Sequence, residues 1–318
     1  MNPRDQQPRR AGPVSSAVAF DALRASTGAR RAARGALTRH DVRLVPTTAG
    51  VMRVRDSGDD GGRPAVVLAC DPPNVVEHYD ALVGLLAERY RVICCEMPGF
   101  GFSRPARGFG FTLPEYERVT EQLLDGLHVT EAVLGFPCIW GYVAVRLAVR
   151  RPDLVRGLVL AQAPHWSEEI AWARRLDPSR LIGRPYVGQL LMAVSAGRVA
   201  RGWYQVALPP GTPATTTAGF TDPAVRALRS GGLFCLASLT QAWFGPATTE
   251  LMHDPVPATQ PAVLLWGQAD RSHRRSHPES ALPYLPDGQV VTYPDAGHFP
   301  ELEQPMRFRE ALALLDRA

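Results

Sequence analysis

Three side chains that could act together in catalysis stand at the ends of apolar runs in this 318-residue sequence: Cys138, Asp270 and His298. A thiolate attacks carbonyl carbon well, an imidazole can take the thiol proton, and a carboxylate can orient the imidazole. The chain contains no lysine, since all 35 residues of the Lys+Arg class are arginine. Mechanisms that need a lysine amine, such as Schiff-base, pyridoxal-phosphate and lysine-dependent phosphate-loop chemistry, are therefore excluded.

The elements that must position these groups form an alternating pattern from residue 40 onward. A hairpin-like stretch comes first, and then fully apolar runs of strand length alternate with helical stretches. The apolar runs are 65–69, 92–95, 132–134, 157–160 and 262–266, and residues 289–293 (QVVTY) add a further strand-length stretch. This order predicts an α/β fold with a doubly wound, mostly parallel sheet.

The alternation is interrupted by a helical, tryptophan-rich segment without a buried-strand run, residues 164–257. We interpret this segment as a helical cap inserted into a core made of residues 38–163 and 258–318. Residues 1–37 are rich in arginine and small residues, and we expect a flexible tail there. The alternative is one arginine-faced helix over residues 16–37.

Positive charge is concentrated at the start of the chain. Residues 1–40 hold eight arginines against two acids, whereas residues 41–318 hold 27 arginines against 29 acids. The formal charge of +4 therefore divides into +6 and −2, and we expect no nucleic-acid face on the body. We also expect that deletion of residues 1–35 leaves activity intact.

The environment of the protein can be predicted from two further absences in the sequence. No apolar run approaches the roughly 20 residues of a membrane span, so no membrane partner is expected. The five cysteines contain no CxxC pair, which favours reduced thiols in a cytoplasm and makes a zinc site improbable.

The motifs at the strand ends resemble those of α/β-hydrolase-fold enzymes with a helical cap. In a parallel sheet, ligands bind beyond the carboxyl ends of the strands, and the resemblance is strongest there. The matching motifs are residues 97–103 (MPGFGFS), 265–270 (LWGQAD) and 297–305 (GHFPELEQP). The likeness extends over residues 40–316 and implies that Asp270 is the triad acid and His298 the catalytic histidine.

The resemblance places Cys138 where the nucleophilic serine of the family normally stands. The family's turn has glycine two residues before and two residues after the nucleophile, but this chain has Phe136 and Trp140 there, and Pro137 precedes the cysteine. A reshaped turn is therefore expected. The following helix would favour a thiolate at its N-terminus, and the competing interpretation of Cys138 is a buried structural thiol.

The loop that supplies the family's oxyanion donor also differs. It usually reads His-Gly followed by a residue whose backbone N–H points at the oxyanion, whereas this chain has Cys70, Asp71 and then Pro72. Proline has no N–H to donate. The Ile139 N–H would supply one donor, and the side chain of Asn74 or a cap tryptophan could supply another.

Further candidates for substrate contact flank these loops. Asp71 is either a substrate-facing acid or a turn residue. Gln162 and Trp166, near the end of the next strand and at the cap entrance, either line the pocket or pack in the core, and Trp140 is a candidate because it follows the nucleophile.

The leading functional hypothesis is cleavage or transfer of an acyl group from an apolar ester, thioester or lactone through Cys138, His298 and Asp270. The expected partner is a small apolar molecule, either free or bound to a carrier as a thioester. No cofactor or metal is implied. The alternatives are a lyase or cyclase that uses His298 as a general base without a covalent step, and a catalytically silent binding protein.

Overall fold

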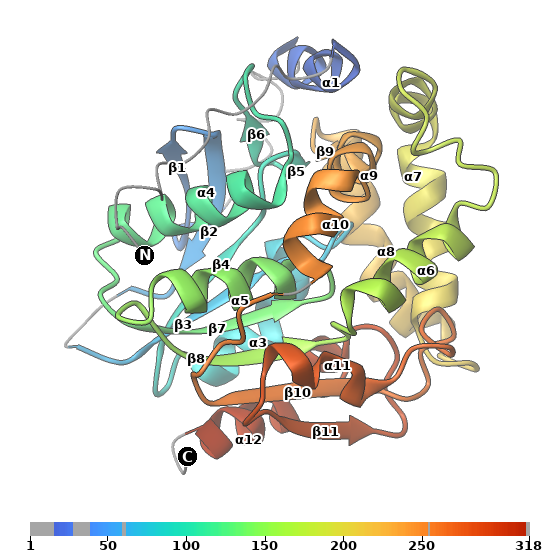
Figure 1. Ribbon diagram of the computed structural model, residues 1–318. Helices are drawn as coiled ribbons and strands as arrows, with labels where there is room; N and C mark the ends of the chain where they lie inside the picture. Colours follow the sequence, from blue (N-terminus) through green and yellow to red (C-terminus); the bar gives the residue numbers. More distant parts are fainter. Residues whose placement is uncertain (1–15, 28–38, 59–61, 254, 316–318) are drawn as a thin grey trace.

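The computed structural model describes residues 16–27, 39–58, 62–253 and 255–315. A nine-stranded sheet forms the centre of this described part (Figure 1), in the order β1-β2-β4-β3-β7-β8-β10-β11 with β6 paired to β2. Pairing is antiparallel from β1 through β2 to β4 and parallel from β4 to β11. The strands are β1 (Val42–Thr47), β2 (Gly50–Asp56), β3 (Ala65–Ala69), β4 (Arg91–Cys95), β6 (Arg104–Pro105), β7 (Ala132–Pro137), β8 (Val155–Ala161), β10 (Ala262–Gly267) and β11 (Gln289–Tyr293).

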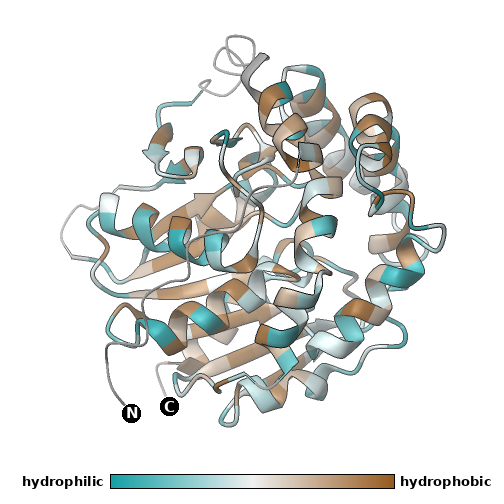
Figure 2. Ribbon diagram, turned by 45° about the horizontal axis from the view of Figure 1, so that its top comes forward, coloured by the Kyte–Doolittle hydropathy of each residue, from teal (hydrophilic) through white to brown (hydrophobic). Residues whose placement is uncertain are grey.

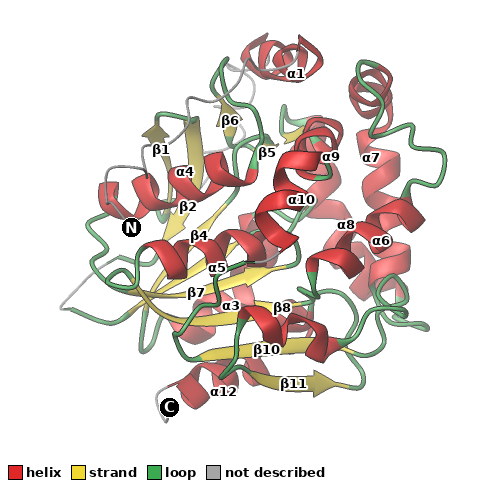
Figure 3. Cartoon of the chain, viewed as in Figure 1, coloured by secondary structure: helices red, strands yellow, loops and turns green. Residues whose placement is uncertain are grey.

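Helices cover both faces of the sheet (Figure 3). The helices of this core are α3 (Asp80–Leu86), α4 (Leu113–Gly126), α5 (Trp140–Arg150), α11 (Pro300–Glu303) and α12 (Pro305–Leu315), with 3₁₀ helices η2 (Val76–Tyr79) and η3 (Pro278–Tyr284). Successive strand residues point to opposite faces. Val67 and Leu134 therefore pack in one core cluster, with residues of α4 and α5, while Val66 and Val133 pack in another, with residues of α3 and α12. The predicted α/β class with a mostly parallel sheet is confirmed.

Buried apolar strands explain why the sheet forms at the centre. All five residues of β3 and all five of β4 are buried, as expected for strands covered on both faces. Figure 2 shows the strands as predominantly hydrophobic and hydrophilic residues along the helices that flank them. Helix α4 begins with a capping box, in which the N–H of Thr112 donates to Glu115 at 3.0 Å.

Residues between β8 and β10 form a helical layer beside the strand ends (Figure 1). Its elements are α6 (Trp166–Leu176), α7 (Val187–Ala207), α8 (Ala214–Arg229), β9 (Leu233–Phe234), α9 (Leu236–Trp243) and α10 (Pro246–His253). The short strand β9 pairs with β5 (Phe100–Gly101) in the loop after β4, which ties this layer to the core. No described helix is long and apolar enough to cross a membrane.

Part of the segment expected to be a flexible tail is folded. Residues Ser16–Thr27 form helix α1, which packs near β6, α7 and α9. The Asp21 side chain is buried and accepts a hydrogen bond from the Ser238 hydroxyl at 2.8 Å. The expectation of flexibility therefore does not hold for α1, because its small apolar side chains have a surface to bury against. The remainder of residues 1–37 lies outside the described residues.

Candidate active site

A strained turn between β7 and α5 presents the Cys138 thiol. Cys138 has φ of 50°, the left-handed region that side chains other than glycine rarely adopt. Its N–H donates to the Ala161 carbonyl at 2.7 Å and its carbonyl accepts from the Gly141 N–H at 2.9 Å. Glycine is required at position 141, because a Cβ there would lie 2.8 Å from that of Ala163. The turn expected from the resemblance thus forms with its glycine displaced by one residue.

The imidazole of His298 is held by a carboxylate and an amide. His298 Nδ1 lies 2.7 Å from Asp270 Oδ2, and Gln162 Nε2 donates to the same oxygen at 2.8 Å. The Gln162 side chain also accepts from the Gly267 N–H at 2.9 Å. Gln162 therefore positions the acid, and it is not among the residues that line the cavity. Asp270 and His298 meet as the resemblance implied.

Cys138 and Asp71 lie on the other side of His298. A ring nitrogen of His298 lies within 4.8 Å of Cys138 Sγ. Asp71 Oδ2 is 3.2 Å from His298 Nε2, an ion-pair distance, although the alignment is too poor for a hydrogen bond. The imidazole is thus placed between two carboxylates, one at each ring nitrogen.

Burial and these neighbours determine the charge of each group. Burial raises the pKa of the Cys138 thiol well above its usual range, Asp71 and Glu169 raise it further, and His298 only partly opposes them. Burial disfavours the imidazolium of His298, but Asp270 and Asp71 outweigh this and hold the pKa of His298 well above its usual value. Burial also raises the pKa of Asp71. These shifts favour the neutral thiol of Cys138 and the imidazolium of His298.

A cavity of about 280 Å³ opens over Cys138 and His298. Its walls are largely apolar and come mainly from α6, α7 and α9, with Asp71 and Pro72 at the base. Apolar wall residues include Ile182, Val199, Leu239 and Phe244. Such walls suit a small apolar substrate.

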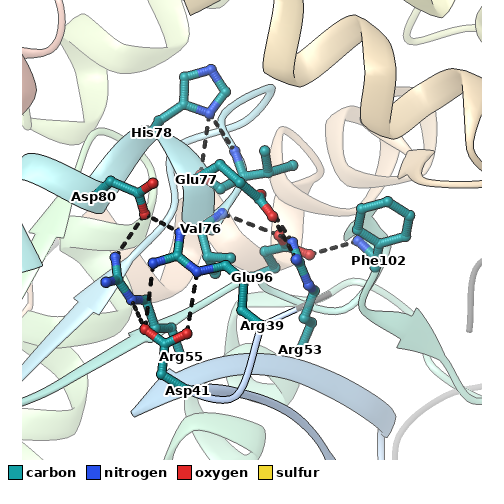
Figure 4. Close-up of polar contacts among 11 residues, drawn as sticks. Arg39, Asp41, Arg53, Arg55, Val76, Glu77, His78, Asp80, Glu96 and Phe102 are labelled. Carbon is teal, nitrogen blue, oxygen red and sulfur yellow. Dashed lines mark hydrogen bonds and ion pairs between the residues drawn. The ribbon is translucent and has the colours of Figure 1, made fainter. Parts of the chain in front are cut away.

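A buried network of charges fixes the segment that follows β3 (Figure 4). The fully buried Arg53 donates to Glu96 at 2.9 Å and to Glu77 at 2.5 Å. Glu96 in turn accepts from the N–H groups of Val76 at 3.1 Å and Phe102 at 2.6 Å. Because Val76 is in the segment that carries Asp71, this network helps to hold the Asp71 loop against the core.

The remaining predicted residues take different positions. Ile139 lines the cavity, and in the described part of the chain its N–H has no acceptor. The Trp140 indole instead donates to the Cys70 carbonyl at 2.9 Å and packs in the core, so Trp140 makes no substrate contact. Trp166 is likewise buried, in an aromatic cluster with Tyr142.

Asn74 also lies away from the cavity wall. Its Oδ1 accepts a hydrogen bond from the Tyr204 hydroxyl of α7 at 2.8 Å, and its N–H donates to the Asp71 carbonyl at 2.8 Å. Asn74 therefore braces the loop against the cap helix, and its amide is not among the groups that line the cavity. The predicted oxyanion role of Asn74 is not met in this arrangement.

Four further residues surround His298: two cap tryptophans, and two residues that sequence reasoning missed, His273 and Glu169. Trp172 lies parallel to the His298 ring at a centroid distance of 6.2 Å, and Trp203 meets it edge-on at 4.8 Å. His273 stacks on both Trp172 and His298. Glu169 is fully buried, neither of its carboxylate oxygens has a hydrogen-bond partner in the described part, and burial raises its pKa to about 8. The tryptophan-rich composition was the one signal that pointed to this aromatic lining.

Cys138, His273 and His298 are the described residues that come nearest to a metal site. One ligand atom from each lies within 4.8 Å of the others. The two imidazole rings, however, are stacked, with planes 17° apart and centroids at 5.3 Å. Imidazole binds a metal in the plane of its ring, and nearly parallel rings do not aim their lone pairs at one point. The arrangement therefore favours a general base beside a thiol.

Comparison with known proteins agrees with this fold. A family model described as the alpha/beta hydrolase fold matches residues 72–305. Haloalkane dehalogenase 2 of Mycobacterium bovis is 27% identical over 271 residues, which cover 81% of this chain and 89% of that protein. A pimeloyl-[acyl-carrier protein] methyl ester esterase of Nitrosomonas europaea is 27% identical over 72% of this chain and 86% of that protein.

Solved structures show the same fold. Epoxide hydrolase A from Mycobacterium thermoresistibile superposes with a TM-score of 0.71 at 19% identity, covering 87% of this chain and 98% of that one. The resemblance drawn from the sequence motifs is confirmed at the level of the family.

Proposed function

Because the chain belongs to the α/β-hydrolase fold family and is an enzyme of that fold, we propose that it hydrolyses or transfers the acyl group of an apolar ester, thioester or lactone through Cys138. The observation that carries this proposal is the position of the thiol. Cys138 stands at the left-handed turn between β7 and α5, lines the cavity, and lies beside an imidazole whose other nitrogen contacts Asp270.

In this mechanism a neutral His298 accepts the thiol proton and Asp270 stabilises the imidazolium that forms. The Cys138 thiolate attacks the carbonyl carbon, and the leaving alcohol or thiol departs with the proton from His298. The acyl group then forms a thioester with Cys138. Water yields a carboxylic acid, and another nucleophile yields acyl transfer.

The chemistry of sulfur supports an acyl substrate over the halides and epoxides named for the relatives. Attack of a thiolate on a haloalkane or an epoxide gives a thioether, which has no carbonyl for water to attack and so ends the reaction. Attack on an acyl carbon gives a thioester, which water can open. The relative named as a methyl ester esterase also supports an ester substrate.

The oxyanion contacts set a limit on the rate. The Ile139 N–H is available, whereas Pro72 at the base of the cavity has no N–H and Asp71 carries a carboxyl. Loss of one donor typically lowers the rate about 100- to 1000-fold. We therefore expect substrates with activated leaving groups, such as thioesters and aryl esters, to be turned over best.

Replacement of Cys138 by alanine tests the proposal. We expect turnover of acyl thioesters and aryl esters to fall about 1000-fold or more, and brief incubation of the wild type to add the mass of the acyl group at Cys138. The control is Cys95→Ala, which removes a thiol buried in β4 and leaves the cavity unchanged. Undiminished turnover by Cys138→Ala would remove the thiol mechanism.

A second candidate follows from the contact between Asp71 and His298. A carboxylate 3.2 Å from Nε2 opposes an oxyanion but suits proton transfer. A lyase or cyclase that uses His298 as general base would need no covalent step. This reaction would survive in Cys138→Ala and give no mass adduct, so the same experiment separates the two candidates.

A further inference from the structure

Arginine is concentrated on one side of the cavity. Residues 166–207 contain six arginines against three acids, Glu168, Glu169 and Asp177, and residues 271–275 contain three more arginines. By contrast, residues 41–318 taken together hold two more acids than arginines. The excess of positive charge on residues 166–207 and on the loop after β10 is therefore a local feature.

The structure brings these arginine-bearing segments together beside the cavity. Trp172 of α6, which lines the cavity, donates from its indole to the Ser272 hydroxyl at 3.1 Å. The Arg271 guanidinium donates to the Gln205 carbonyl of α7, next to the cavity residue Val206. The loop of residues 271–275 thus bridges α6 and α7 at the border of the cavity.

Arg175, Arg274 and Arg275 form a cluster of like charge on this border. Burial and the repulsion of Arg275 and Arg274 lower the pKa of Arg175. Arg175 Nη2 is buried and has no hydrogen-bond partner within the described ranges. The negative charges of Glu168 and Glu169 partly oppose this lowering of the Arg175 pKa. Neither acid, however, forms an ion pair with Arg175 in those ranges.

Such a cluster can bind an anion. Guanidinium groups form paired hydrogen bonds with phosphate and carboxylate oxygens, and an unsatisfied buried donor is costly. Arg274 and Arg275 are exposed and reach solvent, so an anion arriving at the cavity would meet them first.

We propose that Arg175, Arg274 and Arg275, with Arg271 beside them, bind the phosphate of a thiol that carries the acyl group. The inference rests on the proposed acyl chemistry at Cys138 and assigns its substrate class: an apolar acyl thioester of a phosphate-bearing thiol. The acyl chain occupies the apolar cavity, and the phosphate stays at the arginine border. Cys138 takes the acyl group, and the thiol leaves with the proton from His298.

The test compares three hexanoyl thioesters: those of coenzyme A, of a phosphopantetheinylated carrier protein, and of neutral N-acetylcysteamine. We expect the kcat/KM of the coenzyme A ester to exceed that of the neutral ester about 10-fold or more, and salt to reduce the difference. The double variant Arg274→Gln/Arg275→Gln should remove most of this ratio. The control variant Arg89→Gln/Arg118→Gln replaces two exposed arginines elsewhere. It changes the net charge by the same amount and should retain the ratio of the two kcat/KM values.

Equilibrium binding separates this inference from the catalytic proposal. Titration calorimetry should show that coenzyme A itself binds the wild type about 10-fold more tightly than it binds Arg274→Gln/Arg275→Gln. Equal binding of coenzyme A by the two proteins would contradict the proposed phosphate site, whether or not any thioester is turned over. Turnover of the neutral ester alone would support the chemistry at Cys138 and contradict the phosphate site. A preference for the carrier-protein ester over the coenzyme A ester would identify the protein-bound thiol as the source.

Discussion

At the scale of single residues, two carboxylates compete for one imidazole. Asp270 contacts Nδ1 of His298 and Asp71 approaches Nε2, the nitrogen that receives the thiol proton in the proposed mechanism. Both negative charges favour the imidazolium. Since only the neutral imidazole can act as a base, the chemistry is expected to need a pH above that at which His298 loses its proton.

The variant Asp71→Asn tests this electrostatic control. The pKa of His298 is held well above its usual value, so kcat/KM of the wild type should rise with pH as the imidazole deprotonates. Removing the negative charge of Asp71 lowers the pKa of His298, and the rise should move to lower pH. The pH profile of thioester hydrolysis measures this, and a shift to higher pH would contradict it.

His273 should make the fold sensitive to acid. Burial lowers its pKa to about 3, against about 6.5 in an unfolded chain, although Asp270 opposes the shift. Below pH 6.5 the unfolded chain therefore binds more protons, and the free energy of unfolding falls as pH decreases, by up to about 1.4 kcal/mol per pH unit.

Replacing His273 by phenylalanine keeps an aromatic ring stacked on Trp172 and His298 but removes this titration. When the pH is lowered from 7 to 5.5, we expect the free energy of unfolding to fall more for the wild type than for the variant. Urea unfolding at the two pH values measures it. A difference that does not vary with pH would show that His273 is not the responsible group.

At the scale of secondary-structure elements, the buried pair of Arg53 and Glu96 joins β2 to the loops after β3 and β4 (Figure 4). Both side chains are fully buried. Removal of one partner from such a pair leaves an uncompensated charge, which costs about 3–5 kcal/mol.

Arg53→Met is therefore expected to reduce the free energy of unfolding by about 3–5 kcal/mol. Arg43→Ala on the adjacent strand β1 is the matched control, because the Arg43 side chain is 53% exposed and its ion pair with Asp56 should contribute less than about 1 kcal/mol. Chemical denaturation of both variants measures the two changes in free energy of unfolding. Equal changes would contradict the argument that burial makes loss of the Arg53 ion pair more destabilising.

The strands and the meeting of Asp270 with His298 could be anticipated from the sequence, because apolar runs and motif spacing are local signals. The direction of the side chains next to these motifs could not be anticipated. Trp140 lies two residues after Cys138, but its side chain packs in the core against Tyr116 and Trp243. Trp203 reaches His298 because the cap helix α7 is placed over the strand ends, which no short-range pattern encodes, whereas His273 reaches it from the loop after β10.

At the scale of the whole molecule, helix α1 joins the N-terminal segment to the cap. Its residues Ala17, Val18, Ala22 and Ala25 are buried, and Asp21 bonds to Ser238 on α9. Burial raises the pKa of Asp21, with Ser238 and Arg24 opposing. The segment thus has packing interactions that its composition did not indicate.

Deletion of residues 1–27 should therefore lower stability, by about 2 kcal/mol or more, since it strips the apolar contacts and leaves the buried Ser238 hydroxyl without its acceptor Asp21. This replaces the expectation that residues 1–35 are dispensable. Thermal unfolding of the truncated chain is the measurement. The control is a deletion of residues 1–12, which leaves α1 in place, and equal melting temperatures for both truncations would contradict the role of α1.

The order of strands in the sheet has a consequence for the newly made chain. Cys138 follows β7, whereas Asp270 and His298 follow β10 and β11, after the inserted cap helices in the sequence. During synthesis Cys138 therefore leaves the ribosome long before Asp270 and His298 exist. A site that needs all three side chains, as in the proposed mechanism, can form only when translation is nearly finished.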